Sequence, residues 1–303
     1  MAYAAGMNET VSSPPGWLKK RIVSGSAYHR MHTMIRSRGL HTVCREACCP
    51  NQGECYSSGT ATFMILGDRC TRNCRFCAVV NGAPSPVDAQ EARAVAEAIA
   101  SMQLRYAVLT SVTRDDLADG GSSYFAASIE SIRELCKETV VEVLVPDFQG
   151  SEAAIHRVAD AAPEVFNHNI ETVPRLYKRV RPEADYVRSL ELLRTVKRRN
   201  PAIFVKSGLM VGLGESSAEI DATLSDLLEA GCDILTIGQY LAPSAAHYPV
   251  KRYVAPEEYA AFAKSAREKG FAAVVAGSFV RSSYRARDMY LQAINGLKRL
   301  QRN

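Results

Sequence analysis

From Thr62 to Ala276, short apolar runs rich in β-forming residues alternate with longer segments of helical periodicity. This alternation predicts a parallel sheet covered by helices, because each helix returns the chain to the start of the next strand. The expected strands are residues 62–66, 106–110, 140–145, 165–170, 203–211 and 234–237, with a further run at 272–276. The expected helices are residues 86–102, 122–137, 151–161, 186–199, 217–230 and 256–269. Six strand–helix units predict an α/β fold in the form of a partial TIM-type (β/α)6 barrel, whose functional residues follow the C-terminal ends of the strands.

The first expected strand leads directly into a loop that carries Cys70, Cys74 and Cys77. Three residues separate the first two cysteines, and two residues separate the last two. Three thiolates from one short loop can bind three corners of a cubane iron–sulfur cluster and leave the fourth iron open to a substrate or cofactor. The alternative is a zinc site, which usually takes its ligands as two pairs and completes a tetrahedron with a fourth cysteine or histidine. No histidine follows this loop closely, so the pattern favours the cluster.

A second group of cysteines precedes the first expected strand and contains Cys44, Cys48, Cys49 and Cys55. Three of these four could hold another cluster, and the local sequence alone does not decide between Cys48 and Cys49. Seven of the nine cysteines fall within residues 44–77. Because the sequence shows no recognisable secretory signal, this density indicates metal ligands or free thiols rather than disulfides.

Composition and charge limit the classes of partner. The 303 residues are 47% apolar, which is enough for one large domain or two smaller ones. With 37 Lys and Arg against 32 Asp and Glu, the formal charge of +5 is too weak to indicate a nucleic-acid partner. No apolar run approaches the ~20 residues that a bilayer requires, so we expect a cytoplasmic protein without a membrane partner, and an organelle is also compatible with the sequence. Cys136 and Cys232 stand alone in apolar surroundings, and we expect both to be small core residues.

The cysteine loop resembles a known signature. Cys70, Cys74 and Cys77, with the aromatic Phe76 directly before the last of them, are similar to the cluster motif of the radical S-adenosylmethionine enzymes. The resemblance implies that these three thiolates hold a 4Fe–4S cluster. It also implies that the open iron binds S-adenosylmethionine.

Two further segments resemble the lipoyl synthase family. Cys44, Cys49 and Cys55, with four and then five residues between them, are similar to the auxiliary-cluster segment of that family, and residues 59–64 match it too. Near the other end of the chain, residues 281–284 read Arg-Ser-Ser-Tyr, a motif in which lipoyl synthases also end. The resemblance covers nearly the whole chain from Trp17 onward.

This second resemblance implies a ligand set for the auxiliary 4Fe–4S cluster. Cys44, Cys49 and Cys55 would supply three ligands and Ser283 the fourth, with Arg281 beside it. Cys48 falls outside the family pattern and is expected to be a bystander. The residues expected to take part in catalysis are Cys70, Cys74, Cys77, Ser283 and Arg281.

The family resemblance also implies an activity and its partners. Lipoyl synthases insert two sulfur atoms at C6 and C8 of an octanoyl chain held on a lysine of a carrier protein, and they consume the auxiliary cluster as the sulfur source. The expected partners are octanoylated lipoyl domains of 2-oxoacid dehydrogenase complexes, the glycine cleavage H protein, and a ferredoxin- or flavodoxin-type reductant. The protein itself is expected to be a monomer.

Polar side chains at the ends of several expected strands indicate where an adenosyl cofactor would bind. Ser111 follows the second strand and could meet the amino or carboxylate end of the cofactor. Asn169 and Glu171 alternate along the fourth strand, so both would face the barrel interior and could bind ribose hydroxyls. Lys206, in the fifth strand, could pair with a carboxylate. Tyr240 follows the sixth strand, and Phe76 belongs to the cysteine loop itself.

Several of these positions have plain structural alternatives. Asp115 and Asp116 could cap a helix, as could the serines of the Arg-Ser-Ser-Tyr motif. His168 could be a hydrogen-bonded core histidine. Taken one at a time these signals are weak. Their shared position after successive strands is what favours a binding site.

Three other classes of protein remain as alternatives. A methylthiotransferase or a biotin-synthase-like enzyme would also carry two clusters, but the auxiliary spacing and the Arg-Ser-Ser-Tyr motif argue against both. A zinc- or iron-binding structural module would not need the polar rim, and it predicts no response to S-adenosylmethionine. A protein that only relays electrons would not need an open iron site.

The expected organisation places the barrel between two extensions. Residues 1–15 are expected to be disordered, 16–59 to form an N-terminal extension with the auxiliary ligands, 60–270 to form the barrel, and 271–303 to form a C-terminal extension. Trp17 is expected to anchor the N-terminal segment against the body. The candidates for meeting an acidic partner are Lys19, Lys20, Arg21, Lys298, Arg299 and Arg302, and a solvated basic face explains them equally well.

Overall fold

The structure, a computed structural model, describes residues 14–20, 25–47, 49–58 and 60–300. The predictions for Arg21, Cys48 and Arg302, and for most of the segment 1–15, fall outside these residues. The side chains of Lys298 and Arg299 also lie outside the description.

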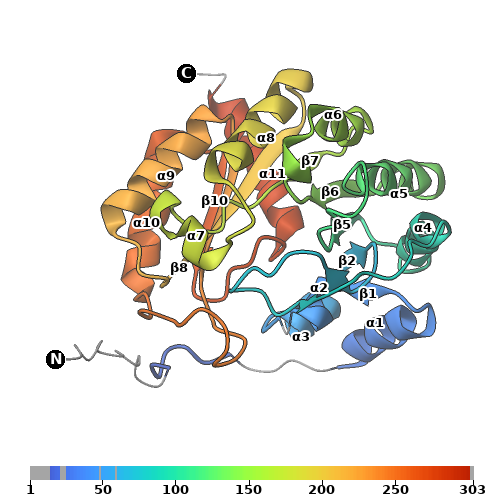
Figure 1. Ribbon diagram of the computed structural model, residues 1–303, viewed down its shortest axis with the longest axis horizontal. Coiled ribbons are helices and arrows are strands. Elements are labelled where there is room, and N and C mark those ends of the chain that lie inside the picture. Colours follow the sequence, from blue (N-terminus) through green and yellow to red (C-terminus); the bar gives the residue numbers. More distant parts are fainter. Residues whose placement is uncertain (1–13, 21–24, 48, 59, 301–303) are drawn as a thin grey trace, which may run out of the picture.

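The described residues form one twisted sheet of eight strands in the order β1-β2-β5-β6-β7-β8-β9-β10 (Figure 1). The two-residue β1 pairs antiparallel with β2, and the following pairs along the sheet are parallel. The strands are β1 (His41–Thr42), β2 (Thr62–Ile65), β5 (Tyr106–Ser111), β6 (Val140–Leu144), β7 (Val165–Asn167), β8 (Phe204–Val211), β9 (Ile234–Gln239) and β10 (Ala273–Gly277). Two short strands, β3 (Arg69–Cys70) and β4 (Val80–Asn81), pair separately at the base of the cysteine loop. The predicted partial barrel is confirmed, and β10 extends its sheet past the expected boundary at residue 270.

Helices cover the outer face of this sheet in an arc, and the N-terminal helices lie beside β1 and β2 (Figure 1). The longer helices are α1 (Ser26–Ser37), α4 (Glu91–Ser101), α5 (Ser122–Leu135), α6 (Glu152–Asp160), α8 (Tyr186–Arg199), α9 (Ser217–Glu229), α10 (Pro256–Lys269) and α11 (Ala286–Leu300). The short ones are α2 (Val43–Glu46), α3 (Gln52–Ser57), η1 (Phe148–Gly150), η2 (Pro174–Leu176) and α7 (Tyr177–Val180). No helix among these combines the length and the apolar character needed to cross a membrane.

The ends of the helices follow local chemistry. Helix α8 begins after Asp185, whose carboxylate accepts a hydrogen bond from the backbone N–H of Arg188. Helix α10 ends at Gly270, which adopts the left-handed conformation with φ of 119°. Helix α4 begins at Glu91 rather than at the predicted residue 86, and the carboxylate of Asp88 accepts a hydrogen bond of 2.8 Å from the N–H of Gln90 in the turn that precedes it.

Strand β7 ends three residues earlier than predicted, and this early end shapes the rim of the barrel. After Asn167 the backbone N–H of Ile170 donates to the side-chain hydroxyl of Ser207 in β8 instead of to a backbone carbonyl of that strand. Glu171 then adopts a left-handed conformation with φ of 64° and forms an isolated bridge with Leu209. Asn169 and Glu171 therefore sit on a turning segment rather than on a regular strand.

Helix α11 covers the N-terminal end of the barrel. One face of the helix, with Ala286, Met289 and Ala293, packs against the strand-start residues Tyr106, Val165, Ile234 and Ala273. Any side chain at Gly296 would strike the carbonyl oxygen of Ala272, so glycine permits this close packing. With one end closed by α11, the opposite end of the barrel is the one left to form a site.

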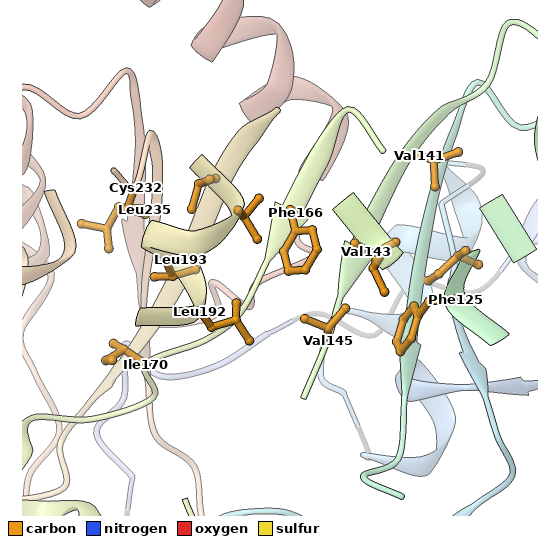
Figure 2. Close-up of a cluster of buried hydrophobic side chains, with 14 of the residues drawn as sticks. Phe125, Val141, Val143, Val145, Phe166, Ile170, Leu192, Leu193, Cys232 and Leu235 are labelled. Atoms are coloured by element: carbon orange, nitrogen blue, oxygen red, sulfur yellow. The ribbon is translucent and has the colours of Figure 1, made fainter. Parts of the chain in front are cut away.

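The main core lies between the sheet and its helices (Figure 2). Phe125 of α5 and Leu192 of α8 are buried with strand residues such as Val143 and Phe166. Cys232 is 2% exposed in the same core, so its prediction as a core residue is confirmed, whereas Cys136 is only partly buried and packs against that core from outside. Trp17, in contrast, is 41% exposed, so the prediction that it anchors the N-terminal segment is wrong.

His168 is a buried core histidine, the structural alternative considered above. Its Nδ1 lies 2.9 Å from the carbonyl oxygen of Val145, and its Nε2 lies 3.1 Å from the hydroxyl of Ser189. Burial, helped by the nearby charge of Arg181, lowers the pKa of His168 to about 4. The imidazole is therefore neutral in the folded protein near pH 7.

This burial predicts a loss of stability in mild acid. In the unfolded chain the pKa returns to about 6.5, so the unfolded state binds the extra proton between pH 6.5 and pH 4. The stabilisation is complete above pH 6.5 and declines as the pH falls through that window. Between pH 7.5 and 5.5 we expect a loss of about 1 kcal/mol, or about 2 °C in the thermal midpoint. In His168→Asn, which cannot titrate, this part of the decline should disappear; an unchanged decline would contradict the assignment.

Candidate functional site

The site lies at the C-terminal ends of the parallel strands, where a cavity of about 460 Å³ opens. Three parts of the chain that are far apart in sequence line it: described residues between Val43 and Thr62, the cysteine loop at residues 76–78, and the turn at residues 280–284. The remaining wall comes from residues at the ends of β6, β8 and β9 and from the segment after β7. A volume of this size is typical of sites for small organic ligands.

The thiols of the cysteine loop lie close enough together to influence one another. Burial raises the pKa of Cys74 to about 12, with the neighbouring thiols of Cys77 and Cys70 adding to the rise and Arg181 opposing it. Burial also raises the pKa of Cys77 to about 11, and Cys70 adds to that rise. The thiols of Cys74 and Cys77 are therefore protonated in the metal-free protein and would release protons on binding iron.

The thiols of Cys44, Cys49 and Cys55 form a second group, and all three line the cavity. Burial raises the pKa of Cys44 to about 11, and Cys49 adds to the rise. Burial raises the pKa of Cys55 to about 12, with Cys44 and Cys49 again contributing. The structure thus brings Cys49 together with its two predicted partners, while Cys48 lies outside the described residues.

Both groups fit a cubane cluster by their donor chemistry, because soft thiolates are the ligands that iron–sulfur clusters take. In the described part of the chain, no three His, Cys, Asp or Glu side chains converge as they would around a single metal ion. A cubane binds each thiolate to a different iron atom, so its ligands lie further apart than those of one ion. All eight described cysteines have free thiols.

The Arg-Ser-Ser-Tyr turn reaches the second thiol group from the other end of the chain. Ser283 lines the same cavity as Cys44, Cys49 and Cys55. The hydroxyl of Tyr284 donates a hydrogen bond of 2.8 Å to Glu54, the residue directly before Cys55. This bond joins the turn that carries Ser283 to the helix that carries one of the predicted cysteine ligands.

Gly238 of β9 makes the approach of this turn possible. A side chain at that position would strike the carbonyl oxygen of Val280 and would lie 3.3 Å from the guanidinium of Arg281. The absence of a side chain at Gly238 therefore lets the turn lie directly on the sheet, with Arg281 facing the cavity.

Arg281 is the cation of the cavity wall nearest the second thiol group. Burial lowers the pKa of Arg281, while Cys49, Tyr259 and Glu171 act in the opposite direction, which shows that all three lie near it. Its Nη1 also donates a hydrogen bond of 2.7 Å to the carbonyl oxygen of Val280. Arg281 thus lies near both the thiol of Cys49 and the carboxyl group of Glu171.

Asn169 and Glu171 both line the cavity, as predicted, although they reach it from a turn. Burial raises the pKa of Glu171 against the opposing effects of Arg181, Asn169 and Arg281. At Gly208 a side chain would lie 2.7 Å from Oδ1 of Asn169, so glycine leaves room for that amide. This Oδ1 is buried without a hydrogen-bond partner, and so is Nε of Arg181. Unpaired buried polar atoms of this kind fit a site whose polar ligand completes their bonding.

The two predicted aromatic residues form one side of the cavity. Phe76 and Tyr240 line it, and both pack in a small apolar cluster with Val173, Leu176 and Leu213. The hydroxyl of Tyr240 donates a hydrogen bond of 2.6 Å to the carbonyl oxygen of Tyr248, so it is already paired. Tyr240 therefore offers its ring, not its hydroxyl, to the cavity.

The prediction that Lys206 meets a cofactor carboxylate is wrong. Its ammonium lies 2.8 Å from the carboxylate of Glu142, the side chain is 1% exposed, and the residue does not line the cavity. The hydroxyl of Tyr106 and the amide of Asn167 also donate to Glu142, at 2.6 and 3.3 Å. Lys206 belongs to a closed polar network inside the barrel, where a buried carboxylate needs such partners.

Ser111 lies near the cysteine loop but does not line the cavity. It ends β5 opposite Ile65 of β2, directly beside the start of the cysteine loop. Its hydroxyl is buried without a hydrogen-bond partner, but the residue lies outside the lining of the cavity. The predicted contact with the cofactor therefore stays a prediction.

The structure also corrects the prediction for Lys20. Its ammonium pairs with Glu54 at 2.9 Å and lies 5.5 and 5.0 Å from the ring centres of Phe279 and Tyr284. It also contacts the side-chain oxygen of Asn51. Lys20 is engaged with the chain itself and is not free for an acidic partner, whereas Lys19 is exposed.

Sequence reasoning missed Arg181, whose charge lies near the thiol of Cys74. The guanidinium donates to the backbone carbonyl of Asn169 at 2.9 Å and lies 5.3 Å from the ring centre of Tyr177. The one available signal was its place before a proline in the long segment after β7. Nothing in the local sequence showed that this segment folds back onto the cysteine loop.

With the geometry established, known proteins provide a comparison. The Radical SAM superfamily matches residues 64–227 of the chain. Lipoyl synthase from Desulfotalea psychrophila is 54% identical over 294 residues, which cover 97% of this chain and 98% of that protein. Lipoyl synthase from Rubrobacter xylanophilus is 54% identical over 282 residues, which cover 93% of this chain and 88% of that protein.

Solved structures agree on the fold. The crystal structure of HydG, a maturase of the FeFe-hydrogenase, aligns with a TM-score of 0.58 and 14% identity, covering 77% of this chain and 54% of that one. Streptococcus suis SuiB bound to S-adenosylmethionine aligns with a TM-score of 0.56 and 12% identity, covering 71% of this chain and 49% of that one. At these identities the alignments establish a shared fold and nothing finer.

Proposed function

We infer the roles of individual residues from the premise that this chain belongs to the lipoyl synthase family of the radical S-adenosylmethionine superfamily. Enzymes of this family insert two sulfur atoms into an octanoyl chain carried by a protein, and this chain is such a sulfur-inserting enzyme. It uses S-adenosylmethionine and two 4Fe–4S clusters, the auxiliary one as sulfur donor. The observation that supports the residue roles most strongly is that Cys44, Cys49, Cys55 and Ser283 line one cavity together with Cys77, whose neighbours in the cysteine loop are Cys70 and Cys74.

The first role is that of the cysteine loop. Cys70, Cys74 and Cys77 would hold the cluster whose open iron takes the amino and carboxylate groups of S-adenosylmethionine. When bound, the cluster and cofactor supply the electron transfer and the 5′-deoxyadenosyl radical that open an unactivated C–H bond, which a general base cannot do. Arg181 lies beside Cys74, where its charge favours the thiolate form of that ligand.

The second role is that of the auxiliary ligands. Cys44, Cys49 and Cys55 would hold the sulfur-donating cluster from the N-terminal extension, residues 16–59. Ser283 would reach it from the C-terminal extension, residues 271–303, and Arg281 places a positive charge beside Cys49. Holding both clusters at one cavity lets the substrate carbon that loses a hydrogen atom stay close to the sulfur that it receives.

The cavity wall has two further roles. Asn169 and Glu171 offer an amide and a carboxyl group that could bind ribose hydroxyls of the cofactor. Phe76 and Tyr240 offer apolar rings that exclude water from the reacting atoms. Excluding water protects a radical from side reactions and strengthens the polar contacts that orient the cofactor.

The finer identities of the partners are also proposals. We propose that the octanoylated substrates are lipoyl domains of 2-oxoacid dehydrogenase complexes and the glycine cleavage H protein. A ferredoxin- or flavodoxin-type protein would supply the electrons. The enzyme would act as a monomer in the cytoplasm. Lys19 is exposed, whereas Lys20 is paired within the chain. Of these two lysines, Lys19 is therefore the one that would meet an acidic carrier.

Anaerobic reconstitution tests the proposed function. The protein would be loaded with iron and sulfide, and then mixed with a reductant, S-adenosylmethionine and an octanoyl-lysyl peptide. Two cubanes predict about eight irons per chain, together with 5′-deoxyadenosine and a peptide that carries two new sulfur atoms. The same iron count with 5′-deoxyadenosine but no thiolated peptide would mean that the enzyme cleaves the cofactor but acts on another substrate. Zinc, or one cluster without cofactor cleavage, would contradict the proposal itself.

A further inference from the structure

The sulfur of Cys70 already accepts two backbone hydrogen bonds. The N–H of Arg72, two residues further along the loop, lies 3.4 Å from Sγ of Cys70. The N–H of Thr113, in the segment after β5, lies 3.3 Å from the same sulfur. Two N–H dipoles therefore point at one predicted ligand of the first cluster.

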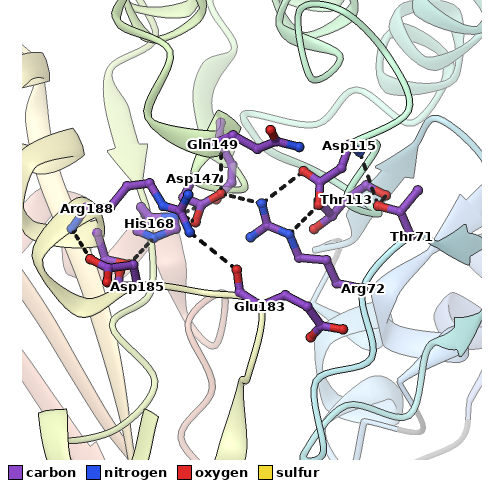
Figure 3. A network of polar contacts seen from close by, with 12 residues as sticks. Thr71, Arg72, Thr113, Asp115, Asp147, Gln149, His168, Glu183, Asp185 and Arg188 are labelled. Carbon is purple, nitrogen blue, oxygen red and sulfur yellow. Dashed lines mark hydrogen bonds and ion pairs between the residues drawn. The ribbon is translucent and has the colours of Figure 1, made fainter. Parts of the chain in front are cut away.

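The side chain of Arg72 ties this loop to the ends of two neighbouring strands (Figure 3). Its guanidinium donates to both carboxylate oxygens of Asp115, at 2.6 and 2.9 Å, and to Oδ1 of Asp147 at 2.7 Å. The side chain is only 4% exposed, and that of Asp147 is fully buried. Arg72 thus joins the cysteine loop to the segments after β5 and β6.

The network is balanced in charge. Arg188 of α8 pairs with the second oxygen of Asp147 at 3.0 Å, so two guanidinium groups face two carboxylates. Burial alone would raise the pKa of Asp147, but the hydrogen bond and charge of Arg72 hold it at about 2. Because the charges of Arg72 and Asp147 are buried and paired, removing one of them would leave the other uncompensated.

Backbone hydrogen bonds carry the same connection to Thr113. The N–H and the hydroxyl of Thr71 both donate to the carbonyl oxygen of Thr113, each at 3.0 Å. The hydroxyl of Thr71 in turn accepts from the N–H of Asp115 at 3.1 Å. Thr113 is therefore held in place from both sides, and its N–H can turn away from Cys70 only if these bonds break.

We propose that Arg72 and Asp115 are positioning residues that hold the N–H groups of Arg72 and Thr113 on the sulfur of Cys70, and that they thereby set the reduction potential of the first cluster. The inference rests on the proposed role of Cys70 as a cluster ligand. Hydrogen bonds to a ligating sulfur stabilise the reduced, more negative form of a cluster, and such outer contacts tune its potential. Loosening them makes the potential more negative, so a given reductant reduces a smaller share of the cluster, and less of it can pass an electron to S-adenosylmethionine.

The test compares reconstituted Arg72→Lys and Asp115→Asn with the wild-type enzyme. Lysine keeps the charge but cannot bind Asp115 and Asp147 through a planar fork. The potential of the first cluster would be measured by redox titration followed by electron paramagnetic resonance, with iron counted per chain. We expect a more negative potential in both variants. We also expect formation of 5′-deoxyadenosine to slow about tenfold at a fixed reductant, the lower end of the effect of losing such outer contacts.

The matched control is Arg199→Lys, which alters an exposed pair with Asp160 at 2.7 Å at the ends of the outer helices α8 and α6. Its potential and rate should equal those of the wild type, because exposed ion pairs contribute little. If Arg72→Lys and Asp115→Asn lose the first cluster, the potential of Thr71→Val tests the inference in their place, because this variant removes only one hydroxyl from the network. The inference is overturned if Thr71→Val has the wild-type potential, or if Arg72→Lys or Asp115→Asn has that potential while it retains its full iron content. A wild-type enzyme that fails to cleave S-adenosylmethionine would instead contradict the proposed function.

Discussion

Replacing Cys70 with alanine should abolish cleavage of S-adenosylmethionine and remove about four of the eight irons expected for two cubanes. The thiol lies beside those of Cys74 and Cys77 and accepts hydrogen bonds from two backbone N–H groups. No other described cysteine lies in this loop to replace it. The checks are the iron count of the reconstituted protein and the yield of 5′-deoxyadenosine.

Cys136→Ala is the control for this variant. Cys136 is half-buried against the core and does not line the cavity, so its loss should leave both iron count and cofactor cleavage at wild-type levels. The auxiliary cluster of Cys70→Ala should remain, because its predicted ligands come from other segments. Production of 5′-deoxyadenosine by Cys70→Ala would show that the first cluster is held elsewhere.

Much of this fold could be predicted because its signals are local. The bounds of α8 and α10 follow from periodicity and from caps such as Asp185 and Gly270, which act within one turn of the helix. The order of strands and helices along the sequence was enough to predict a parallel sheet, since each crossover helix returns the chain to the end of the sheet where the previous strand began. The early end of β7 escaped prediction because it depends on the hydroxyl of Ser207 in the neighbouring strand.

The site was predictable where ligands cluster in sequence and not where partners are distant. The spacing of the cysteines indicates cluster ligands, but nothing near Arg72 in the sequence distinguishes it from an ordinary cationic loop residue. Its carboxylate partners lie 43 and 75 residues further along the chain. The prediction for Lys206 was wrong for the same reason, because its partner Glu142 lies 64 residues away on another strand. A period of two residues shows which face of a strand a side chain takes, but not whether it lies at the rim or deep in the barrel.

Replacing Cys49 with alanine should separate the two halves of the reaction. We expect the variant to cleave S-adenosylmethionine and to abstract hydrogen from the octanoyl chain, but to insert no sulfur and to lack about four irons. The reason is that Cys49 belongs to the thiol group beside Arg281 and not to the cysteine loop. Deuterium transfer from labelled octanoyl-lysyl peptide to 5′-deoxyadenosine measures the step that should survive, and mass spectrometry of the peptide measures the one that should fail.

Cys48→Ala provides the matched comparison, because it removes the adjacent thiol at the position that the family pattern leaves out. It should retain both clusters and full sulfur insertion. If Cys49→Ala still makes the lipoyl product while Cys48→Ala does not, then Cys48 is the third auxiliary ligand. The thiol of Cys49 raises the pKa of both Cys44 and Cys55, so the described structure favours Cys49 as the third auxiliary ligand. Loss of cofactor cleavage in Cys49→Ala would instead mean that the first cluster cannot assemble without the second, since Cys77 lines the same cavity as the auxiliary thiols.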